Sequence, residues 1–526
     1  MKYAILFSTR EDMMHDLARY VLGDRLMVID GRINGGAMVA SANVNRSSCA
    51  YLVVIRNWDG NNLLDLSSIL PTGILGLWFE DCPQTIELND SAFVFPSAKN
   101  LLLLNLGSFC SLKKLPDSIG ELKRLRYLNA PRIQDLVLPS CITRLDRLRC
   151  LSLLDSCLLL DLTEAFGRLC WLQQLDLSGC SGLKALPDSF GRLEQLYCLD
   201  LSGCSGLKAL PNSFGRLHML LHLDLSGCSG LKALPDSFGR LENVDHLDLS
   251  GCSGLKALPD SFGRIRWLSH LDLSGCSCVG GITEALNEVL PRCRLHHLNL
   301  SHRCGYFSVE DWFHLKDLDK VLPRLRKTLQ FLGLSSCLNP VCYTSSPEKS
   351  KEYVDRCIRE LVKLEHLDLS QNKFLVQLPE SIGNLKELRS LDLSGCFRLD
   401  RLPESIGELK QLCKLNLSGC FRLERLPERV GELKEMETLD LSGCPQFDPL
   451  PESEKQKLSM LLSEGSLTTI TDHKAKSQER SIASDDQDKS RSSTPQDASF
   501  LHPQGAPFDQ SCAAEPEITE ATDEGQ

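Results

Sequence analysis

The 526-residue sequence contains no run of the roughly 20 apolar residues that a membrane-spanning helix needs. It also has no Gly-Lys dipeptide, which excludes the phosphate-binding loop G-x-x-x-x-G-K-[ST]. The apolar run near the N-terminus is too short for the core of a signal peptide, and Arg10, Glu11 and Asp12 follow it at once. These absences predict a soluble, cytoplasmic protein with no membrane span.

The excess of negative over positive charge is small outside the C-terminal end. Of the net charge of −11, residues 471–526 supply −7, from 12 acidic and 5 basic residues. The remaining body is nearly neutral, which argues against a nucleic-acid partner. From about residue 465 onward Ser, Thr, Asp, Gln and Pro dominate, and too few apolar side chains remain to offset the entropy lost on ordering. We therefore expect a disordered, acidic tail.

Internal repetition dominates the rest of the chain. The segment Leu175–Leu193 reads LDLSGCSGLKALPDSFGRL and recurs at 199–217, 223–241 and 247–265 with at most one substitution. These copies lie 24 residues apart, as do those of a second block that starts at Leu364. Looser copies bring the total to sixteen, and extra residues interrupt the array within 278–363.

The repeat has the pattern of a short strand followed by a tight return. Leu175 and Leu177 alternate with polar residues, which is the period of a half-buried strand. Pro187 and Gly191 keep the return short and unsuited to a long helix. One unit cannot bury its own leucines, so the copies must stack side by side. The predicted fold is an α/β solenoid of about 16 repeats of ~24 residues, with a curved parallel β-sheet and a short irregular or helical convex side.

Cysteine is abundant, but its placement does not fit a disulfide framework. Ten of the 24 cysteines occupy one repeat position: Cys82, Cys180, Cys204, Cys228, Cys252, Cys276, Cys337, Cys396, Cys420 and Cys444. A small apolar side chain at a fixed repeat position is typical of a packed core. We predict a buried ladder in which each S–H points toward a neighbouring backbone carbonyl.

The pattern L-x-x-L-x-L-x-x-C is that of leucine-rich repeats. The run Leu115–Leu145 (LPDSIGELKRLRYLNAPRIQDLVLPSCITRL) resembles the leucine-rich-repeat region of grass nucleotide-binding resistance proteins, which are plant intracellular immune receptors. Met13–Val21 (MMHDLARYV) resembles the helix that leads from their nucleotide-binding module into the repeats. The resemblance implies a defence-related protein that binds a pathogen effector, a host protein or a full-length immune receptor.

Two departures from that family concern nucleotide binding. The phosphate-binding loop is absent, and Met14-His15-Asp16 matches the family's nucleotide-sensing triplet only as text. The family's run, M-H-D-L-V-H-D-L-A, has two His-Asp pairs, and the Leu-Ala-Arg after Asp16 fits the second of them. In this register the sensor triplet falls on Arg10-Glu11-Asp12, so the sensing His is missing. We expect no cofactor and no ATP-driven switch.

We expect three parts along the chain. Residues 1–48 form an N-terminal cap, or a remnant of the nucleotide-binding module's end. Residues 49–451 form the solenoid, with irregular inserts at 278–363 in which 282–290, 309–322 and 350–364 have helical periodicity. Residues 452–526 form a C-terminal cap helix and the disordered tail.

The candidate protein-binding surface is the concave face of the sheet, where solvent-facing strand positions form columns. The first column holds His222, His246, His270, His297 and His366. The second holds Asp200, Asp224, Asp248, Asp272 and Asp368, and the third is nearly all Ser. This acidic face would suit a basic partner, and protonation of the histidines beside the carboxylates would make binding sensitive to pH. Duplication copies idle positions too, so a solvated face without function explains the same columns.

A second candidate protein-binding site lies in the inserts, which are unlike the rest of the chain. Aromatic residues are only 6% of the sequence but gather there, and aromatic anchors often dominate binding energy. The candidates are Tyr306, Phe307, Trp312, Phe313, Tyr343 and Tyr353. Packing of an inserted helix onto the solenoid would explain them equally well.

We predict no catalytic residues and no metal site, because the same Ser, His and Asp recur along an open sheet without a nucleophile turn or a closed ligand shell. The sequence thus favours a non-enzymatic protein with a recognition or regulatory role in defence. An intracellular signalling scaffold resembling the Ras-group leucine-rich-repeat proteins is one alternative. A fragment of a larger receptor ATPase is the other.

Overall fold

A computed structural model of the chain describes residues 26–30, 39–40, 52–57, 73–82, 85–86, 99–276, 294–302, 318–338, 346–447 and 467–468. The chain divides into a unit Met1–His473 and a unit Lys474–Gln526. All described residues belong to the first unit. The predicted acidic tail, the predicted N-terminal helix and the predicted cap helix after Pro451 lie outside the described residues.

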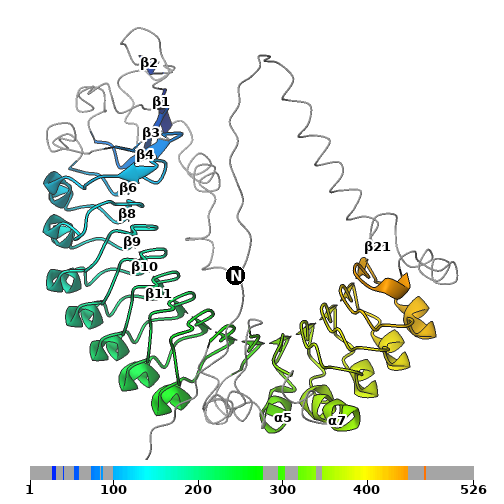
Figure 1. Cartoon of the computed structure of the whole chain (residues 1–526). Coiled ribbons are helices and arrows are strands. Elements are labelled where there is room, and N and C mark those ends of the chain that lie inside the picture. The colour runs from blue at the N-terminus through cyan, green and yellow to red at the C-terminus, as the bar shows by residue number, and fades with distance from the viewer. Residues whose placement is uncertain are drawn as a thin grey trace, which may run out of the picture. The chain divides into compact units, whose positions relative to one another are not determined.

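A single sheet of 19 strands runs through the first unit, and Figure 1 shows its strands along one side of the coil and the short helices along the other. Sixteen of the described strands, each parallel to its neighbours in the repeat array, correspond to the sixteen predicted repeats. They are β3 (Leu52–Arg56), β4 (Gly76–Glu80), β6 (Leu103–Asn105), β8 (Tyr127–Asn129), β9 (Cys150–Ser152), β10 (Gln174–Asp176), β11 (Cys198–Asp200), β12 (His222–Asp224), β13 (His246–Asp248), β14 (His270–Asp272), β15 (His297–Asn299), β16 (Phe331–Gly333), β17 (His366–Asp368), β18 (Ser390–Asp392), β19 (Lys414–Asn416) and β20 (Thr438–Asp440). The predicted leucine-rich-repeat solenoid is confirmed.

The register is one repeat per strand. Leu175 of β10 pairs with Leu199 of β11, which places equivalent residues of successive copies side by side. The same pairing continues through the irregular region, where β15 pairs with β16 and β16 with β17. The inserts therefore leave the sheet continuous, because the extra residues enter outside the strands.

The sheet extends beyond the predicted repeat limits of 49 and 451. β1 (Leu26–Asp30) adds to β3 in parallel, and β2 (Val39–Ala40) pairs with β1 antiparallel. β21 (Leu467–Thr468) adds to β20. β5 (Thr85–Ile86) and β7 (Ser111–Leu112) form a separate two-stranded sheet. Leu26–Asp30 reads LMVID, so its side chains suit a strand even though the repeat's leucine spacing is missing.

Short 3-10 helices form the side opposite the strands. Ten of the repeats carry one of five residues, each preceded by a Pro or Thr in an extended or near-extended conformation that cannot be part of the helix. They are η3 (Asp117–Glu121), η4 (Ser140–Arg144), η5 (Glu164–Arg168), η6 (Asp188–Arg192), η7 (Asn212–Arg216), η8 (Asp236–Arg240), η9 (Asp260–Arg264), η11 (Glu380–Asn384), η12 (Glu404–Glu408) and η13 (Glu428–Glu432). A terminal turn, η14 (Pro445–Phe447), follows.

Close packing between neighbouring 3-10 helices requires glycine. A Cβ built on Gly191 would lie 2.3 Å from the backbone oxygen of Ser213 in the next repeat. The adjacent turn therefore approaches closer than any larger residue permits. The predicted short return, with Gly191 as one of its causes, is confirmed.

The irregular region contains the longest described helix, α7 (Pro347–Ile358). It begins three residues before the predicted 350–364 because the Ser346 side chain accepts a hydrogen bond from the Lys349 amide, and Pro347 occupies the first helical position. It packs near α5 (Leu318–Val321) and η10 (Leu322–Leu325). An ion pair of 2.7 Å joins the Arg356 Nε and the Asp319 Oδ2.

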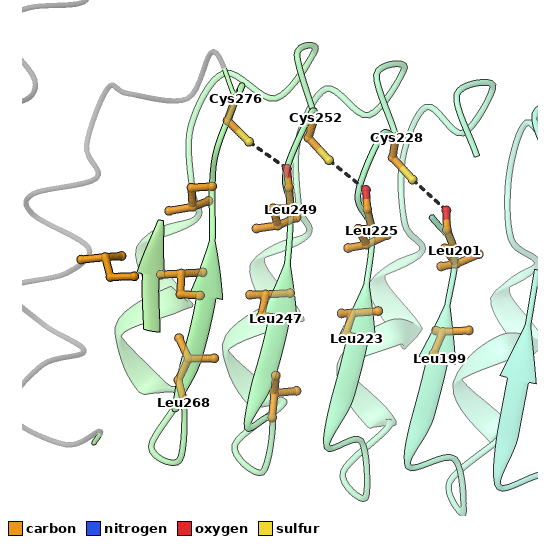
Figure 2. Packing of buried hydrophobic residues seen from close by; sticks show 14 of the residues in the cluster. Leu199, Leu201, Leu223, Leu225, Cys228, Leu247, Leu249, Cys252, Leu268 and Cys276 are labelled. Carbon is orange, nitrogen blue, oxygen red and sulfur yellow. Dashed lines mark hydrogen bonds between the residues drawn. The ribbon is translucent and has the colours of Figure 1, made fainter. Parts of the chain in front are cut away.

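The cysteine ladder is confirmed (Figure 2). The Cys228 Sγ lies 3.1 Å from the Leu201 carbonyl oxygen, and the Cys252 Sγ lies 3.1 Å from that of Leu225. All ten ladder thiols are buried, and burial raises the pKa of Cys180 and Cys420 to about 12. Burial thus keeps Cys180 and Cys420 protonated, and each ladder thiol donates to a backbone carbonyl of the preceding repeat.

Candidate functional site

The first predicted column is a ladder of stacked rings on the exposed face of the sheet, here called the ring ladder: His222, His246, His270, His297, Phe331 and His366. The ring centroids of His246 and His270 lie 3.9 Å apart, and those of His270 and His297 lie 3.8 Å apart. His222 is tilted at one end, 5.6 Å from His246. The strand spacing of a parallel sheet, about 4.8 Å, brings these rings into contact.

Phe331 is a member of the ring ladder that sequence reasoning missed. Its ring stacks on His297 at 4.0 Å with an interplanar angle of 9° and lies 6.3 Å from His366. It occupies the column because it follows the repeat start at Leu329 by two residues, as His270 follows Leu268. That register is readable in the sequence, but Phe331 is apolar and does not stand out in a column of polar residues.

The expectation that the histidines would be protonated beside the carboxylates is wrong in direction. Burial lowers the pKa of His222 and His246. Burial, together with the neighbouring His246 and His297, lowers the pKa of His270 to about 3. Burial lowers the pKa of His297 to about 4, although Asp272 acts to raise it. The loss of hydration outweighs the attraction of the carboxylates, so these four rings are neutral near pH 7.

The second column, of Asp residues, first serves the turns that end the strands. The Oδ1 of Asp224 accepts a 2.8 Å hydrogen bond from the Ser226 amide, and the Oδ1 of Asp248 accepts one of 2.7 Å from Ser250. Asp200, Asp272 and Asp368 do the same with Ser202, Ser274 and Ser370, each at 2.8 Å. One carboxylate oxygen of each residue is thereby committed to its own repeat.

The carboxylates are crowded and partly desolvated. Burial is the main cause that raises the pKa of Asp200 and Asp248 to about 6, and the neighbouring Asp224 adds to it in both cases. Burial also raises the pKa of Asp368. Asn299 relieves the crowding at one place, because its Nδ2 donates to the Asp272 Oδ2 at 2.9 Å. The column is an acidic surface in which Asp200 and Asp248 lose their charge as pH falls through about 6.

The described part of the chain contains no group of three His, Cys, Asp or Glu side chains arranged to hold a metal ion. In the same residues, no helix combines the length and the apolar character that crossing a bilayer requires. The face therefore offers neutral aromatic rings, carboxylates and hydroxyls, which suit non-covalent contacts with another molecule.

The second candidate site is described only in part. Tyr306, Phe307, Trp312, Phe313 and Tyr343 lie outside the described residues. Tyr353 lies on α7 with only 7% of its surface exposed, and it joins the core beside Val354 and Cys357. This side chain packs the inserted helix onto the solenoid and is not an exposed anchor.

Comparisons with known proteins agree with this architecture. The family model of a leucine-rich repeat region matches residues 313–463, and the model of a single leucine-rich repeat matches residues 171–193. The chain therefore contains a leucine-rich repeat region, a fold that is typically a non-catalytic scaffold for protein interaction. No curated protein matches the sequence.

Several solved structures resemble the chain. A leucine-rich-repeat protein of Leptospira interrogans is 25% identical, with 74% of this chain and 90% of that one covered and a TM-score of 0.53. An internalin of Listeria monocytogenes is 15% identical, with coverages of 67% and 85% and a TM-score of 0.38. The Arabidopsis receptor kinase HAESA, solved with the peptide hormone IDA and the co-receptor SERK1, is 18% identical, with coverages of 71% and 67% and a TM-score of 0.35.

Proposed function

We propose that this chain is a protein-binding leucine-rich-repeat protein of the plant disease-resistance type. It has a recognition or regulatory role in defence, acts in the cytoplasm without a nucleotide switch of its own, and is not an enzyme. The observation that carries the binding role is the half-buried ring ladder beside the carboxylate column, spanning β12 to β17. The resemblance of Leu115–Leu145 to grass resistance proteins supports the defence role. Among the described residues, all 18 cysteines lie outside any disulfide, which supports a reducing compartment.

The chemistry of this face favours a basic partner. Neutral imidazoles present flat faces and one donor and one acceptor each, which accommodate backbone groups and guanidinium planes. The Asp column supplies negative charge two residues farther along each strand, on the same face of the sheet. A partner segment rich in Arg or Lys could stack on the rings while its cations pair with the carboxylates.

Two matched triple variants test this proposal. The first variant combines Asp224→Asn, Asp248→Asn and Asp272→Asn, which removes three negative charges from the sheet face. It keeps the turns, because Asn299 and Asn416 already accept the same Ser amide bond at 3.1 Å. Asp188→Asn, Asp236→Asn and Asp260→Asn remove the same charge from the helix side, where the copy at 212 already carries Asn.

Tagged wild type and both variants are expressed in grass leaf cells, and their copurifying proteins are quantified by mass spectrometry. We expect the sheet-face variant alone to lose a basic protein, and that protein to be an effector, its host target or an immune receptor. The ion leakage that accompanies immune cell death should change with the same variant. Equal recovery of all partners by both variants would remove the sheet face from the proposal.

A further inference from the structure

A second surface lies where the chain turns away from β18 and β19. In the regular copies the residue after the ladder cysteine is an exposed Ser, at positions 181, 205, 229 and 253. In two consecutive copies of the second block it is Phe397 and Phe421. Their ring centroids lie 5.0 Å apart at an interplanar angle of 33°, and Phe421 is 53% exposed. Two adjacent copies have therefore exchanged a hydroxyl for a partly uncovered aromatic ring.

The two rings line a groove of about 520 Å³, here called the phenylalanine groove, whose lining residues come from four successive repeats. Ser394, Ser418 and Ser442 also line it. Gly419 has a φ of +70°, and a Cβ built there would lie 4.0 Å from the Phe397 ring. Glycine thus satisfies the backbone and leaves the ring uncovered. The side chain of Gln371 lies directly against Gly395 and closes one end of the groove.

Three basic side chains lie near the groove, alongside the Asp392 and Asp440 carboxylates that accept from the Ser394 and Ser442 amides. The Lys373 Nζ lies 5.5 Å from the Phe397 centroid, within cation–π range. Exposed Arg398 and Arg422 directly follow the two phenylalanines, where the regular copies carry glycine. The Arg398 guanidinium carbon lies 5.7 Å from the ring centroid of Phe374. Both changes, Ser to Phe and Gly to Arg, occur together in the same two copies.

We propose that the phenylalanine groove docks a short acidic peptide segment of a partner protein. An aromatic or proline side chain of the segment packs on Phe397 and Phe421, its carboxylates pair with Arg398 and Arg422, and its backbone bonds to the serine hydroxyls. The lining from four successive repeats suits an extended chain. The charge of Arg398 and Arg422 is opposite to that of the Asp column, so the two surfaces select different partner segments. This inference does not depend on the proposed function of the sheet face.

A random 12-residue peptide library displayed on phage tests the proposal with the full chain. Selection is carried out on wild type after depletion on the variant with Phe397→Ser and Phe421→Ser. That variant restores the residue of the regular copies, so its fold should be retained, and a circular dichroism melt checks this. We expect enriched peptides to carry at least one aromatic or proline residue together with several Asp or Glu.

Affinities of the enriched peptides are then measured by fluorescence anisotropy. We expect binding to weaken at least about tenfold in the double Phe→Ser variant and about three- to tenfold with Arg398→Gln and Arg422→Gln. The control with Trp171→Ser and Trp267→Ser, which removes two rings exposed by 58% and 65% in the first block, should bind normally. The triple sheet-face variant should also bind normally, which separates this result from the proposed function. No enrichment, basic peptides, or equal binding to the double Phe→Ser variant would overturn the proposal.

Discussion

Two blocks of this solenoid have the same strands and cysteine ladder but stabilise their helix side differently. Residues 172–276, the aromatic block, stack Phe190, Phe214, Phe238 and Phe262 at centroid distances of 6.1 to 6.4 Å with nearly parallel rings. Residues 364–447, the charged block, place Ile382, Ile406 and Val430 at those positions. The aliphatic side chains fill the core with less apolar surface, and the neighbouring surface carries ionic contacts.

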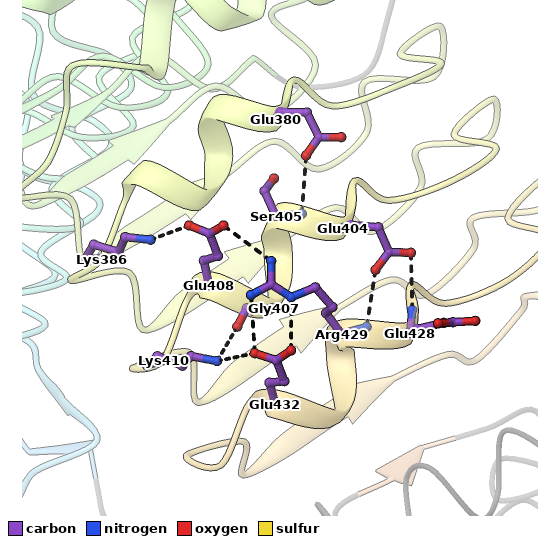
Figure 3. Close-up of polar contacts among 10 residues, drawn as sticks. All are labelled: Glu380, Lys386, Glu404, Ser405, Gly407, Glu408, Lys410, Glu428, Arg429 and Glu432. Atoms are coloured by element: carbon purple, nitrogen blue, oxygen red, sulfur yellow. Dashed lines mark hydrogen bonds and ion pairs between the residues drawn. The ribbon is translucent and has the colours of Figure 1, made fainter.

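Those ionic contacts join one repeat to the next (Figure 3). The Glu404 carboxylate accepts from the amides of Glu428 and Arg429 at 3.4 and 3.3 Å. Ion pairs of 2.7 Å link Lys386 to Glu408 and Lys410 to Glu432. The aromatic block has Asp or Asn at the position of Glu404, one methylene shorter. Exposed ion pairs contribute little free energy. The buried Phe, Ile and Val side chains therefore stabilise each block, while the surface charges align neighbouring repeats.

The largest effect should come from breaking the aromatic stack. Phe214 is fully buried between Phe190 and Phe238. Phe214→Ala should cost about 3–5 kcal/mol of unfolding free energy, because it removes apolar contact and leaves a cavity. Urea denaturation measures this, and hydrogen exchange should show loosening centred on η6 to η8. A cost below about 1 kcal/mol would mean that the stack adds nothing over the aliphatic packing of the charged block.

The ring ladder, which lies over the aromatic block and the irregular region, should make stability depend on pH. The pKa of His270 is about 3 in the fold and about 6.5 when unfolded, so the unfolded chain takes up the proton first. The contribution of the neutral ring is therefore complete above pH 6.5 and declines as pH falls toward 3. His270→Phe, which introduces the residue that the ladder already carries at Phe331, should gain roughly 1–2 kcal/mol relative to wild type at pH 4.5, after discounting for screening by solvent.

Denaturation of both proteins at pH 7.5 and 4.5 measures that difference. Asp200 and Asp248 remain in both, so their own titration cancels. A gap between the two proteins that does not change with pH would show that the His270 ring is well hydrated. An NMR titration of the ring is an independent check.

A smaller effect should separate the two roles of the Asp column. Asp224→Ala removes the acceptor of the Ser226 amide and should cost about 1 kcal/mol. Asp224→Asn, which introduces the residue that the charged block carries at 416, should cost less than about 0.5 kcal/mol. Thermal melts of the two variants measure the difference. Equal losses would mean that charge, and not the turn bond, stabilises this strand end.

The smallest effect should come from the charged surface. Glu432 pairs with Lys410 and Arg429, and its hydrogen bonds with Arg429 and then Lys410 hold its pKa at about 2. Its contribution is present above pH 4.5 and is lost as pH falls through 2. Glu432→Gln should leave the melting temperature almost unchanged and reduce the sensitivity of the charged block to salt. A large drop in melting temperature would show that these ion pairs carry the block.

Repetition is what made the fold predictable. Leu175 and its equivalents recur at a fixed spacing, so stacked repeats bury every one of them in the same way. The sheet, the strand register and the cysteine ladder follow from that stacking. The Asp and His columns line up as the spacing implied. No comparable rule exists for β1, which joins the sheet through backbone pairing with β3 and lacks the leucine pattern.

The chemistry of the site was less accessible than its geometry. His270 is neutral because the stacked rings of His246 and His297 shield it from water. The neighbouring Asp residues, read from the sequence alone, suggest a raised pKa instead. Tyr353 could equally face solvent or core, because helical spacing does not say which side of α7 meets the solenoid. The phenylalanine groove depends on the 5.0 Å approach of the Phe397 and Phe421 rings, which only coordinates reveal.

Each cysteine of the ladder can report when its own repeat separates from the preceding one. The sulfur of Cys252, for example, is covered because the preceding coil lies against it, so a soluble alkylating reagent can reach it only when those two coils separate. Peptide-resolved rates of modification would then give the free energy of parting each neighbouring pair, with Cys228 and Cys420 serving as probes of separate stretches.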